Sequence, residues 1–349
     1  MKVAGYAMRT RGEPLDRFEY DATPGPGEAL VEVRGCGVCH TDLGFLDDGV
    51  PVRHELPLIL GHEVSGSVVE VGEGAGDLVG KNVVVPAVIP CGACKACERG
   101  RGSICKKQVF PGNDVHGGFA THLVVPAHGL VPVDAAGEDL IRLSVVADAV
   151  STAYQAILRS GLTAGDFAVF VGAGGVGGFG VQIAAALGAR VAAIDVDAER
   201  LEALRPHGAE WTIDATGKDA RAIKQEIRGL VKEAGLPSTE WKVFETSGTR
   251  PGQETAFALL TFGAYLGVVG YHPGDVTVRL SNLMAFDARA EGNWGCLPGN
   301  YPAVLELVTS GKVDLRPFVE TFPLSEVNAV LDRLRKHELK KRAVLLPDS

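Results

Sequence analysis

The sequence predicts an α/β protein in which a doubly wound parallel sheet is inserted into a β-rich domain. Over the first 150 residues, apolar and polar positions alternate between glycine- and proline-rich turns, which is typical of short strands. From Phe167 onward, apolar strands alternate with helical stretches, a pattern typical of βαβ units. Near residue 293 this alternation stops, which indicates that the chain returns to the first domain.

The length of 349 residues suits two domains, at roughly 150 residues per domain. We expect a catalytic β-rich domain at residues 1–149 and 294–349, with a metal lobe at about 90–106. The dinucleotide-binding domain is expected at residues 150–293. It should contain strands at Trp241–Glu245 and Ala264–Val269.

A helix is expected close to the C-terminus. Apolar residues recur there at helical spacing over 327–334, and Ser325 precedes them as a potential N-cap. The basic stretch Lys336–Arg342 suits the end of that helix, because positive side chains are favourable at a helix C-terminus.

Composition narrows the classes of function. Apolar residues make up 46% and charged residues 22%, which is ordinary globular usage. The net charge of −9 makes nucleic acid an unlikely partner, since phosphate backbones need a concentrated basic face. No apolar run approaches the roughly 20 residues that cross a bilayer, and the first residues contain no secretory signal. We expect a cytoplasmic protein without a membrane partner.

A glycine-rich turn follows the strand Ala168–Val171 and opens a helix at Gly178–Leu187. Its glycines permit a tight turn, close approach to a pyrophosphate, and close helix–strand packing. Asp195 ends the next strand at the spacing at which a carboxylate binds the adenosine ribose, so NAD is expected in preference to NADP. The cofactor-binding candidates are Gly172, Gly174, Gly175, Val176, Gly177, Asp195, Arg200 and Val269. For Arg200, a solvated helix residue is the alternative.

Four of the seven cysteines lie within fifteen residues, as Cys91, Cys94, Cys97 and Cys105. Disulfides or free core thiols are the alternatives, but residues three apart around glycine and lysine suit a loop wrapped around an ion. Four sulfurs complete a tetrahedral zinc site and leave no position for a substrate. The pattern therefore predicts a structural zinc.

Several motifs in order carry a resemblance that spans essentially the whole chain. They are Gly35–Asp42, Gly61-His62-Glu63, the four-cysteine lobe, Gly117–Ala120, and Gly172–Gly177 with Asp195. Together they resemble the zinc-dependent medium-chain alcohol dehydrogenases. The resemblance implies a GroES-like catalytic domain, a Rossmann domain, a zinc- and NAD-dependent oxidation of an alcohol, and a homo-oligomer, by analogy a tetramer.

The resemblance also implies a second, catalytic zinc. By motif, Cys39 and His62 match two of its ligands. At the third position many relatives have cysteine and this chain has Asp148, which is a valid zinc ligand and equally a possible helix N-cap. Glu63 is expected as an alternate ligand or a supporting residue, and Asp42 as the residue that orients His62.

The family mechanism relays a proton from the position of Thr41 to a histidine, and this chain has Gly44 where that histidine would lie. His40, His54 or bulk water remain as the terminal acceptor, and His40 is alternatively a pyrophosphate contact. Arg342 resembles a family pyrophosphate contact, with a solvated helix end as the alternative. Cys36 is expected in the core, and Cys296 has no assigned role.

Two features bear on the substrate. Ala87 lies where many relatives carry a bulky aromatic residue, which suggests room for a larger or cyclic alcohol. The segment Phe110–Phe119 resembles that of the 6-hydroxycyclohex-1-ene-1-carbonyl-CoA dehydrogenases of anaerobic aromatic degradation. That resemblance implies a secondary alcohol on a ring attached to a CoA thioester. The alternatives are a general secondary-alcohol or polyol dehydrogenase without CoA, and a zinc-free quinone or enoyl reductase of the same fold.

Overall fold

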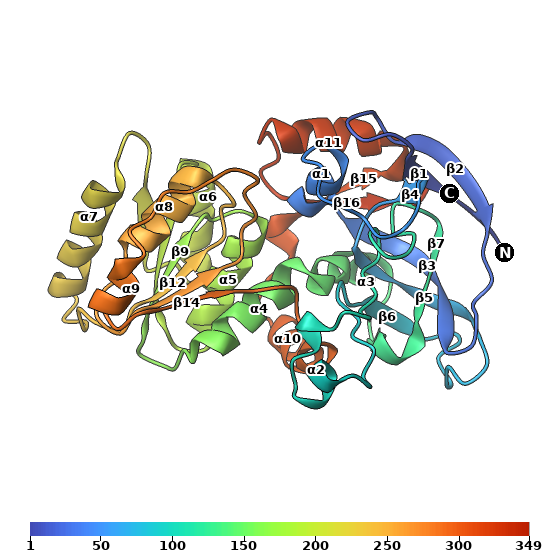
Figure 1. Cartoon of the computed structure of the whole chain (residues 1–349), viewed down its shortest axis with the longest axis horizontal. Coiled ribbons are helices and arrows are strands. Elements are labelled where there is room, and N and C mark those ends of the chain that lie inside the picture. Colours follow the sequence, from blue (N-terminus) through green and yellow to red (C-terminus); the bar gives the residue numbers. More distant parts are fainter. Residues whose placement is uncertain (349) are drawn as a thin grey trace. The chain divides into compact units, whose positions relative to one another are not determined.

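A computed structural model describes residues 1–348 (Figure 1). The chain forms two compact units. The first unit comprises Met1–Ser151, Gly295–Leu305 and Leu315–Ser349, and the second comprises Thr152–Trp294 and Glu306–Asp314. Glu306–Asp314, the end of a helix and the turn after it, groups with the second unit, whereas the sequence analysis expected it in the catalytic domain. The expected domain boundaries stay a prediction.

The first unit is built mainly on antiparallel strands, with one parallel pair at the edge of its larger sheet. A three-stranded sheet has the order β2-β1-β4, and a larger sheet has the order β15-β16-β3-β5-β6-β8, with β7 also paired to β3. The bounds are β1 Lys2–Met8, β2 Asp16–Asp21, β3 Glu28–Gly37, β4 Leu58–Ile59, β5 Glu63–Val71, β6 Asn82–Val85, β7 His122–Pro126, β8 Val131–Pro132, β15 Val319–Pro323 and β16 Arg342–Leu346. Apolar side chains of these strands form one core with those of α11 (Val327–Arg335).

Short helices and 3₁₀ turns lie in the connections between these strands. They are α1 His40–Leu46, α2 Lys95–Glu98, α3 Gly137–Arg142 and the 3₁₀ turns Gly102–Ile104 and Leu143–Ala147. Two further helices, α4 Ala149–Ser160 and α10 Tyr301–Thr309, begin in the first unit and continue into the second.

The second unit is a parallel sheet of order β11-β10-β9-β12-β13-β14. The chain runs from β9 outward through α5 and α6 to β11, returns through α7 to β12, and continues through α8 to β13. Because these crossovers are right-handed, α5 and α6 cover one face and α7 and α8 the other. The bounds are β9 Phe167–Val171, β10 Arg190–Asp195, β11 Trp211–Asp214, β12 Lys242–Glu245, β13 Tyr265–Val268, β14 Arg289–Gly292, α5 Gly175–Ala186, α6 Ala198–Leu204, α7 Ala220–Glu233, α8 Arg250–Ala258 and α9 Ser281–Ala285. The doubly wound prediction is confirmed.

Two details differ from the sequence predictions. Helix α5 begins at Gly175 rather than Gly178, because the glycine turn already closes with a hydrogen bond from Gly178 N to Gly174 O. Ser325 does not cap α11: it lies inside a 3₁₀ turn and its hydroxyl donates to Asp348.

The basic stretch Lys336–Arg342 lies after the end of α11 and does not form its last turn. The helix ends at Arg335, and His337 has a left-handed backbone with φ of 55° that turns the chain away. Arg342 begins β16 and is buried. No helix among the described residues is long and apolar enough to span a bilayer.

Candidate active site

Four side chains from distant parts of the first unit converge at one point. Cys39, His62, Glu63 and Asp148 each offer a ligand atom, and these atoms all lie within 4.8 Å of one another. Cys39 precedes α1, His62 and Glu63 lie at the start of β5, and Asp148 precedes α4. The structure thus brings together the three residues predicted to bind the catalytic zinc, with Glu63 beside them.

One buried carboxylate holds two of these residues in place. Asp42 Oδ2 accepts a hydrogen bond from Cys39 N at 2.9 Å, and Asp42 Oδ1 accepts one from Gly61 N at 3.1 Å. The same Oδ1 lies 3.3 Å from His62 Nδ1. Asp42 therefore fixes the backbone beside both side chains and faces the imidazole ring, the supporting role expected for it.

The residues fit a bound cation. Both ring nitrogens of His62 are buried without a hydrogen bond, and Nε2 lies 3.7 Å from Asp148 Oδ2. Burial lowers the pKa of His62, but the carboxylates of Asp42 and Asp148 outweigh it and raise the pKa well above its usual value. A buried thiol, imidazole and carboxylate with excess negative charge match the ligand preferences of zinc.

The structure also separates the two roles left open for Asp148. The first N–H of α4, on Ala149, donates to Glu63 Oε1 at 3.0 Å. Glu63 thus caps this helix from another strand, and the Asp148 carboxylate faces His62. The geometry favours Asp148 as a metal ligand.

Glu63 is held in turn by Arg342. Arg342 Nε donates to Glu63 Oε2 at 2.9 Å, Arg342 Nη2 donates to Oε1, and both side chains are buried. Both carboxylate oxygens of Glu63 therefore have partners, which favours the supporting role over that of an alternate ligand. The solvated helix end considered for Arg342 is wrong; its contact with the cofactor stays a prediction.

Replacing Arg342 with methionine should destabilise the protein by about 3–5 kcal/mol, because Glu63 would remain buried with an unpaired charge. Urea unfolding measures the change. The matched control is Arg335→Met, which removes the exposed pair with Asp47 and should cost about 1 kcal/mol or less. Equal losses in the two variants would contradict this account of Glu63.

The remaining catalytic candidates lie around Cys39. The Cys39 thiol donates to Thr41 Oγ1 at 3.6 Å, so this hydroxyl borders the cluster. His40 is exposed, and its ring stacks on that of His337 with centroids 5.7 Å apart. His54 is half-buried and lies against His116, with ring centroids 4.5 Å apart. Which of them accepts the proton stays a prediction.

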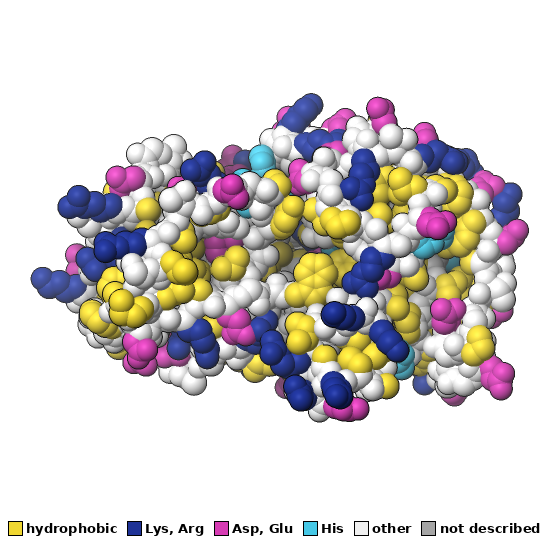
Figure 2. All heavy atoms as spheres, viewed as in Figure 1, with side chains coloured by type: hydrophobic (Ala, Val, Ile, Leu, Met, Phe, Trp, Pro, Cys, Tyr) yellow, Lys and Arg dark blue, Asp and Glu magenta, His cyan; other side chains and the backbone are white. Residues whose placement is uncertain are grey.

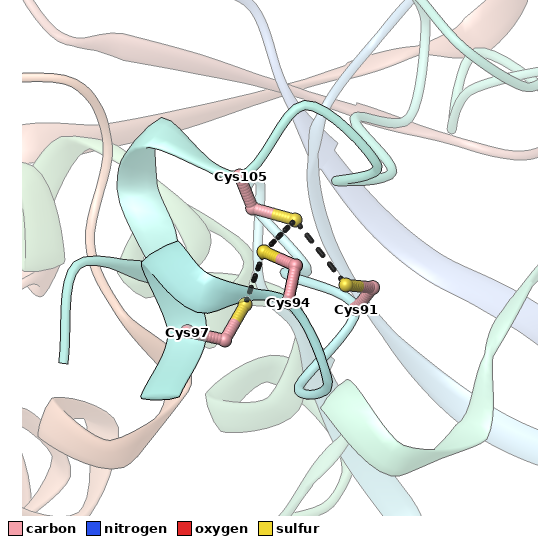
Figure 3. A group of neighbouring side chains, drawn as sticks. All are labelled: Cys91, Cys94, Cys97 and Cys105. Atoms are coloured by element: carbon pink, nitrogen blue, oxygen red, sulfur yellow. Dashed lines mark hydrogen bonds between the residues drawn. The ribbon is translucent and has the colours of Figure 1, made fainter. Parts of the chain in front are cut away.

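Figure 3 shows the second cluster, in which four cysteine side chains point toward one centre. The sulfur atoms of Cys94 and Cys97 lie 3.5 Å apart, and Cys105 Sγ lies 3.7 Å from Cys94 Sγ and 3.5 Å from Cys91 Sγ. These separations are too long for disulfides and suit thiolates around one ion. The N–H of Cys97 donates to Cys94 and helps to lower the pKa of Cys94 to about 6, which favours the thiolate that a metal binds.

In the second unit, the glycine turn lies where β9 meets α5. Gly172 has a φ of 100°, which favours glycine. A Cβ on Gly177 would lie 1.8 Å from Gly172 O, so only glycine allows the close packing of helix on turn that a dinucleotide-binding site requires. Gly174 caps α5, and no atom lies within 4 Å of where its Cβ would be, which leaves the helix N-terminus open to a pyrophosphate.

Asp195 lies at the end of β10. Its Oδ2 accepts from Ala173 N at 2.6 Å and its Oδ1 accepts from Asp197 N at 2.9 Å. The carboxylate therefore ties the glycine turn to the next loop. Arg200 lies on α6, 3.6 Å from Asp197, and Val269 directly follows β13.

Replacing Asp195 with alanine should lower the NAD-to-NADP ratio of kcat/KM by at least about tenfold, because the ribose 2′-hydroxyl loses its acceptor and a 2′-phosphate is no longer repelled. Steady-state kinetics with both cofactors measure the ratio. An unchanged ratio would show that Asp195 does not select the cofactor.

Sequence reasoning missed two residues beside this turn. Thr246 Oγ1 donates to Gly172 O at 2.7 Å, and Glu245 Oε1 accepts from the N–H groups of Ser247 and Gly248 at 2.9 and 3.1 Å. Together they hold the loop after β12 against the loop after β9. Their only signal in the sequence was their position at the end of a predicted strand.

Comparisons with known proteins agree with this geometry. Residues 25–135 match the alcohol dehydrogenase GroES-like domain, and residues 175–310 match the zinc-binding dehydrogenase model. An alcohol dehydrogenase of Geobacillus stearothermophilus is 32% identical over 91% of both chains.

Solved structures extend the similarity. A cobalt- and zinc-bound alcohol dehydrogenase from Pyrobaculum aerophilum is 26% identical, with a TM-score of 0.85 over 99% of this chain and 100% of that one. An acetophenone reductase of Geotrichum candidum in complex with NAD is also 26% identical, with a TM-score of 0.84 over 99% of this chain and 97% of that one. The chain belongs to the zinc-dependent medium-chain alcohol dehydrogenases and is an NAD-dependent enzyme of that family.

Proposed function

We propose that the protein oxidises a secondary alcohol on a six-membered ring that is attached to a CoA thioester, of the 6-hydroxycyclohex-1-ene-1-carbonyl-CoA type. The products are the ring ketone, NADH and a proton. When bound, zinc supplies a Lewis acid for the substrate oxygen and NAD accepts the hydride.

The position of the segment Phe110–Phe119 carries this proposal. The ring of Phe110 lies 5.0 Å from that of His62, measured between centroids. The N–H groups of Gly117, Phe119 and Gly118 donate to Ile59, Leu60 and Gly61, the residues directly before His62. The segment whose sequence resembles the CoA-dependent subfamily is therefore also the one that packs beside the metal cluster.

Two further observations support a ring-bearing secondary alcohol. Ala87 is buried, and its N–H donates to Ala147 O at 3.2 Å, directly before Asp148. We infer that a small side chain at this position leaves room for a ring beside the cluster. The similarity to an acetophenone reductase adds support for a secondary alcohol, because acetophenone is a ketone attached to a ring and its reduction gives a secondary alcohol beside that ring.

The chain's own residues have defined tasks in this reaction. Asp42 keeps the His62 ring facing the cluster, and the Glu63–Arg342 pair holds the start of α4 beside Asp148. The Thr41 hydroxyl lies next to Cys39 and is the first group that would receive the proton of the alcohol.

The test is NADH formation, followed by absorbance, from the cyclic hydroxy-enoyl alcohol as its CoA thioester, as the free acid, and from cyclohexanol. We expect kcat/KM for the thioester to exceed that for the free acid by about a hundredfold or more, because remote binding energy contributes to the rate. Equal rates would contradict the CoA substrate.

A general alcohol dehydrogenase is the second candidate. It is favoured by the name of the Geobacillus stearothermophilus relative, at 32% identity. Rates with simple alcohols equal to or above those with the thioester would establish it. A zinc-free quinone or enoyl reductase would leave both clusters of metal-binding side chains without a role.

A further inference from the structure

The cysteine lobe has a concentration of positive charge, although the whole chain has a net charge of −9. Residues 91–107 contain a single carboxylate, Glu98, and five exposed cationic side chains. These are Lys95, Arg99, Arg101, Lys106 and Lys107. Figure 2 shows Lys and Arg side chains gathered over α2 on the face drawn. We call these five side chains the basic surface of the lobe.

The basic surface has no carboxylate partners of its own. Within residues 1–348, none of its five cations forms an ion pair. Some exposed arginines elsewhere do: Arg205 pairs with Glu202 at 2.9 Å and Arg250 with Glu254 at 3.1 Å. Unpaired cations this close together repel one another, so an anion that binds between them gains from all of them.

The frame beneath the basic surface is compact. Lys95 directly follows Cys94, and Lys106 directly follows Cys105. Each cysteine sulfur atom lies within 3.7 Å of a neighbouring sulfur, so the backbone segments that carry these lysines are close together. With zinc bound, the loop keeps the cations at the same spacing whether or not an anion is bound. This preorganisation lowers the entropy cost of binding the anion.

The lobe also packs against a segment that leads to the catalytic cluster. A Cβ on Gly102 would lie 2.9 Å from Leu297 Cδ2, so the backbone of the lobe contacts this side chain directly. Four residues further on, the buried Tyr301 donates its hydroxyl to Ala147 O, directly before Asp148. Residues 297–301 thus link the lobe to the backbone beside Asp148 within the first unit.

We propose that the basic surface binds the 3′-phosphate and diphosphate of a CoA-type substrate, while the acyl end lies at the Cys39–His62–Asp148 cluster. This inference rests on the proposed function. A phosphate monoester carries about two negative charges near neutral pH, and the diphosphate adds more. Arginine binds such groups through two parallel hydrogen bonds, and lysine binds them as a point charge. The lobe offers both types of side chain.

The test compares the zinc-loaded wild type with a lobe variant that carries Arg99→Gln, Arg101→Gln and Lys106→Gln. A control variant carries Arg221→Gln, Arg228→Gln and Lys232→Gln, which removes the same types of exposed charge from α7. Isothermal titration with desulfo-CoA measures binding without a thiol that could reach a metal. The kinetic probe is the CoA thioester, set against the same acyl group on N-acetylcysteamine, which lacks the nucleotide.

We expect the lobe variant to bind desulfo-CoA about tenfold more weakly and to show a similar rise in KM for the CoA thioester. Its kcat, and its KM for the N-acetylcysteamine thioester, should stay at the wild-type values. In the wild type the KM for the CoA thioester should rise with salt, and this rise should be smaller in the lobe variant.

Three results would overturn the inference: no binding of desulfo-CoA to the wild type, equal affinity in the wild type and the lobe variant, or equal weakening in the control variant. A loss of zinc or of melting temperature without a change in affinity would show that the cations only balance the charge of the thiolates, and would also overturn it. If the lobe variant alone loses desulfo-CoA but the wild type does not oxidise the thioester, the basic surface stands and the proposed substrate is wrong.

Discussion

Cys39→Ser is expected to lower kcat by about a thousandfold or more while NAD still binds. The Lewis acid at this cluster stabilises developing charge by several kcal/mol, and each 1.4 kcal/mol or so corresponds to a factor of ten. Serine is a much poorer zinc ligand than a thiolate, so the cluster would lose its metal. Steady-state kinetics and NAD titration on the same sample separate the loss of catalysis from any loss of cofactor binding.

Cys36→Ala is the matched control for this variant. Cys36 lies three residues earlier on β3, is fully buried, and belongs to the apolar core of the first unit. Its replacement should cost some stability through a small cavity but leave kcat within about a factor of two to three. If Cys39→Ser retained the wild-type rate, the catalytic-metal assignment would be wrong.

Cys105→Ser is expected to affect stability far more than it affects the chemistry. Cys105 is the buried member of the four-cysteine cluster, and its sulfur lies beside those of Cys91 and Cys94. A structural zinc contributes directly to folding free energy, and among these four residues only Cys105 is buried, so little else holds the lobe together. The melting temperature should fall, zinc should drop from about two ions per chain to one, and proteolysis should cut within 90–106.

Cys296→Ala serves as the control for that experiment. This cysteine is also buried in the first unit but belongs to neither metal cluster. It should retain both zinc ions and show only the modest loss expected of a small core truncation. A Cys105→Ser variant with unchanged zinc content and melting temperature would contradict a structural metal in the lobe.

Much of the fold and the four-cysteine cluster could be predicted because their signals are local. The glycine turn, Asp195 and the four cysteines each occupy a short stretch whose spacing reflects the geometry of one ligand. The Cys39, His62 and Asp148 positions came from the family resemblance, and folding places them within one cluster.

What could not be predicted depends on contacts between distant residues. Glu63 pairs with Arg342, 279 residues away, and the same carboxylate caps α4. In the sequence, only a family resemblance to a pyrophosphate contact distinguishes Arg342 from Lys340 and Lys341, and nothing near it indicates a pairing with Glu63. The end of α11 was misplaced for a related reason: His337 adopts a left-handed backbone that the residue type alone does not require.

We propose that Asp148 completes a metal site with Cys39 and His62, separate from the cysteine lobe. Zinc analysis of the purified wild type and of Asp148→Asn tests it most directly, because asparagine keeps the shape and removes the anionic ligand. We predict about two zinc ions per chain in the wild type and about one in the variant, with a similar melting temperature and little turnover. Two zinc ions and a wild-type rate in Asp148→Asn would contradict the claim.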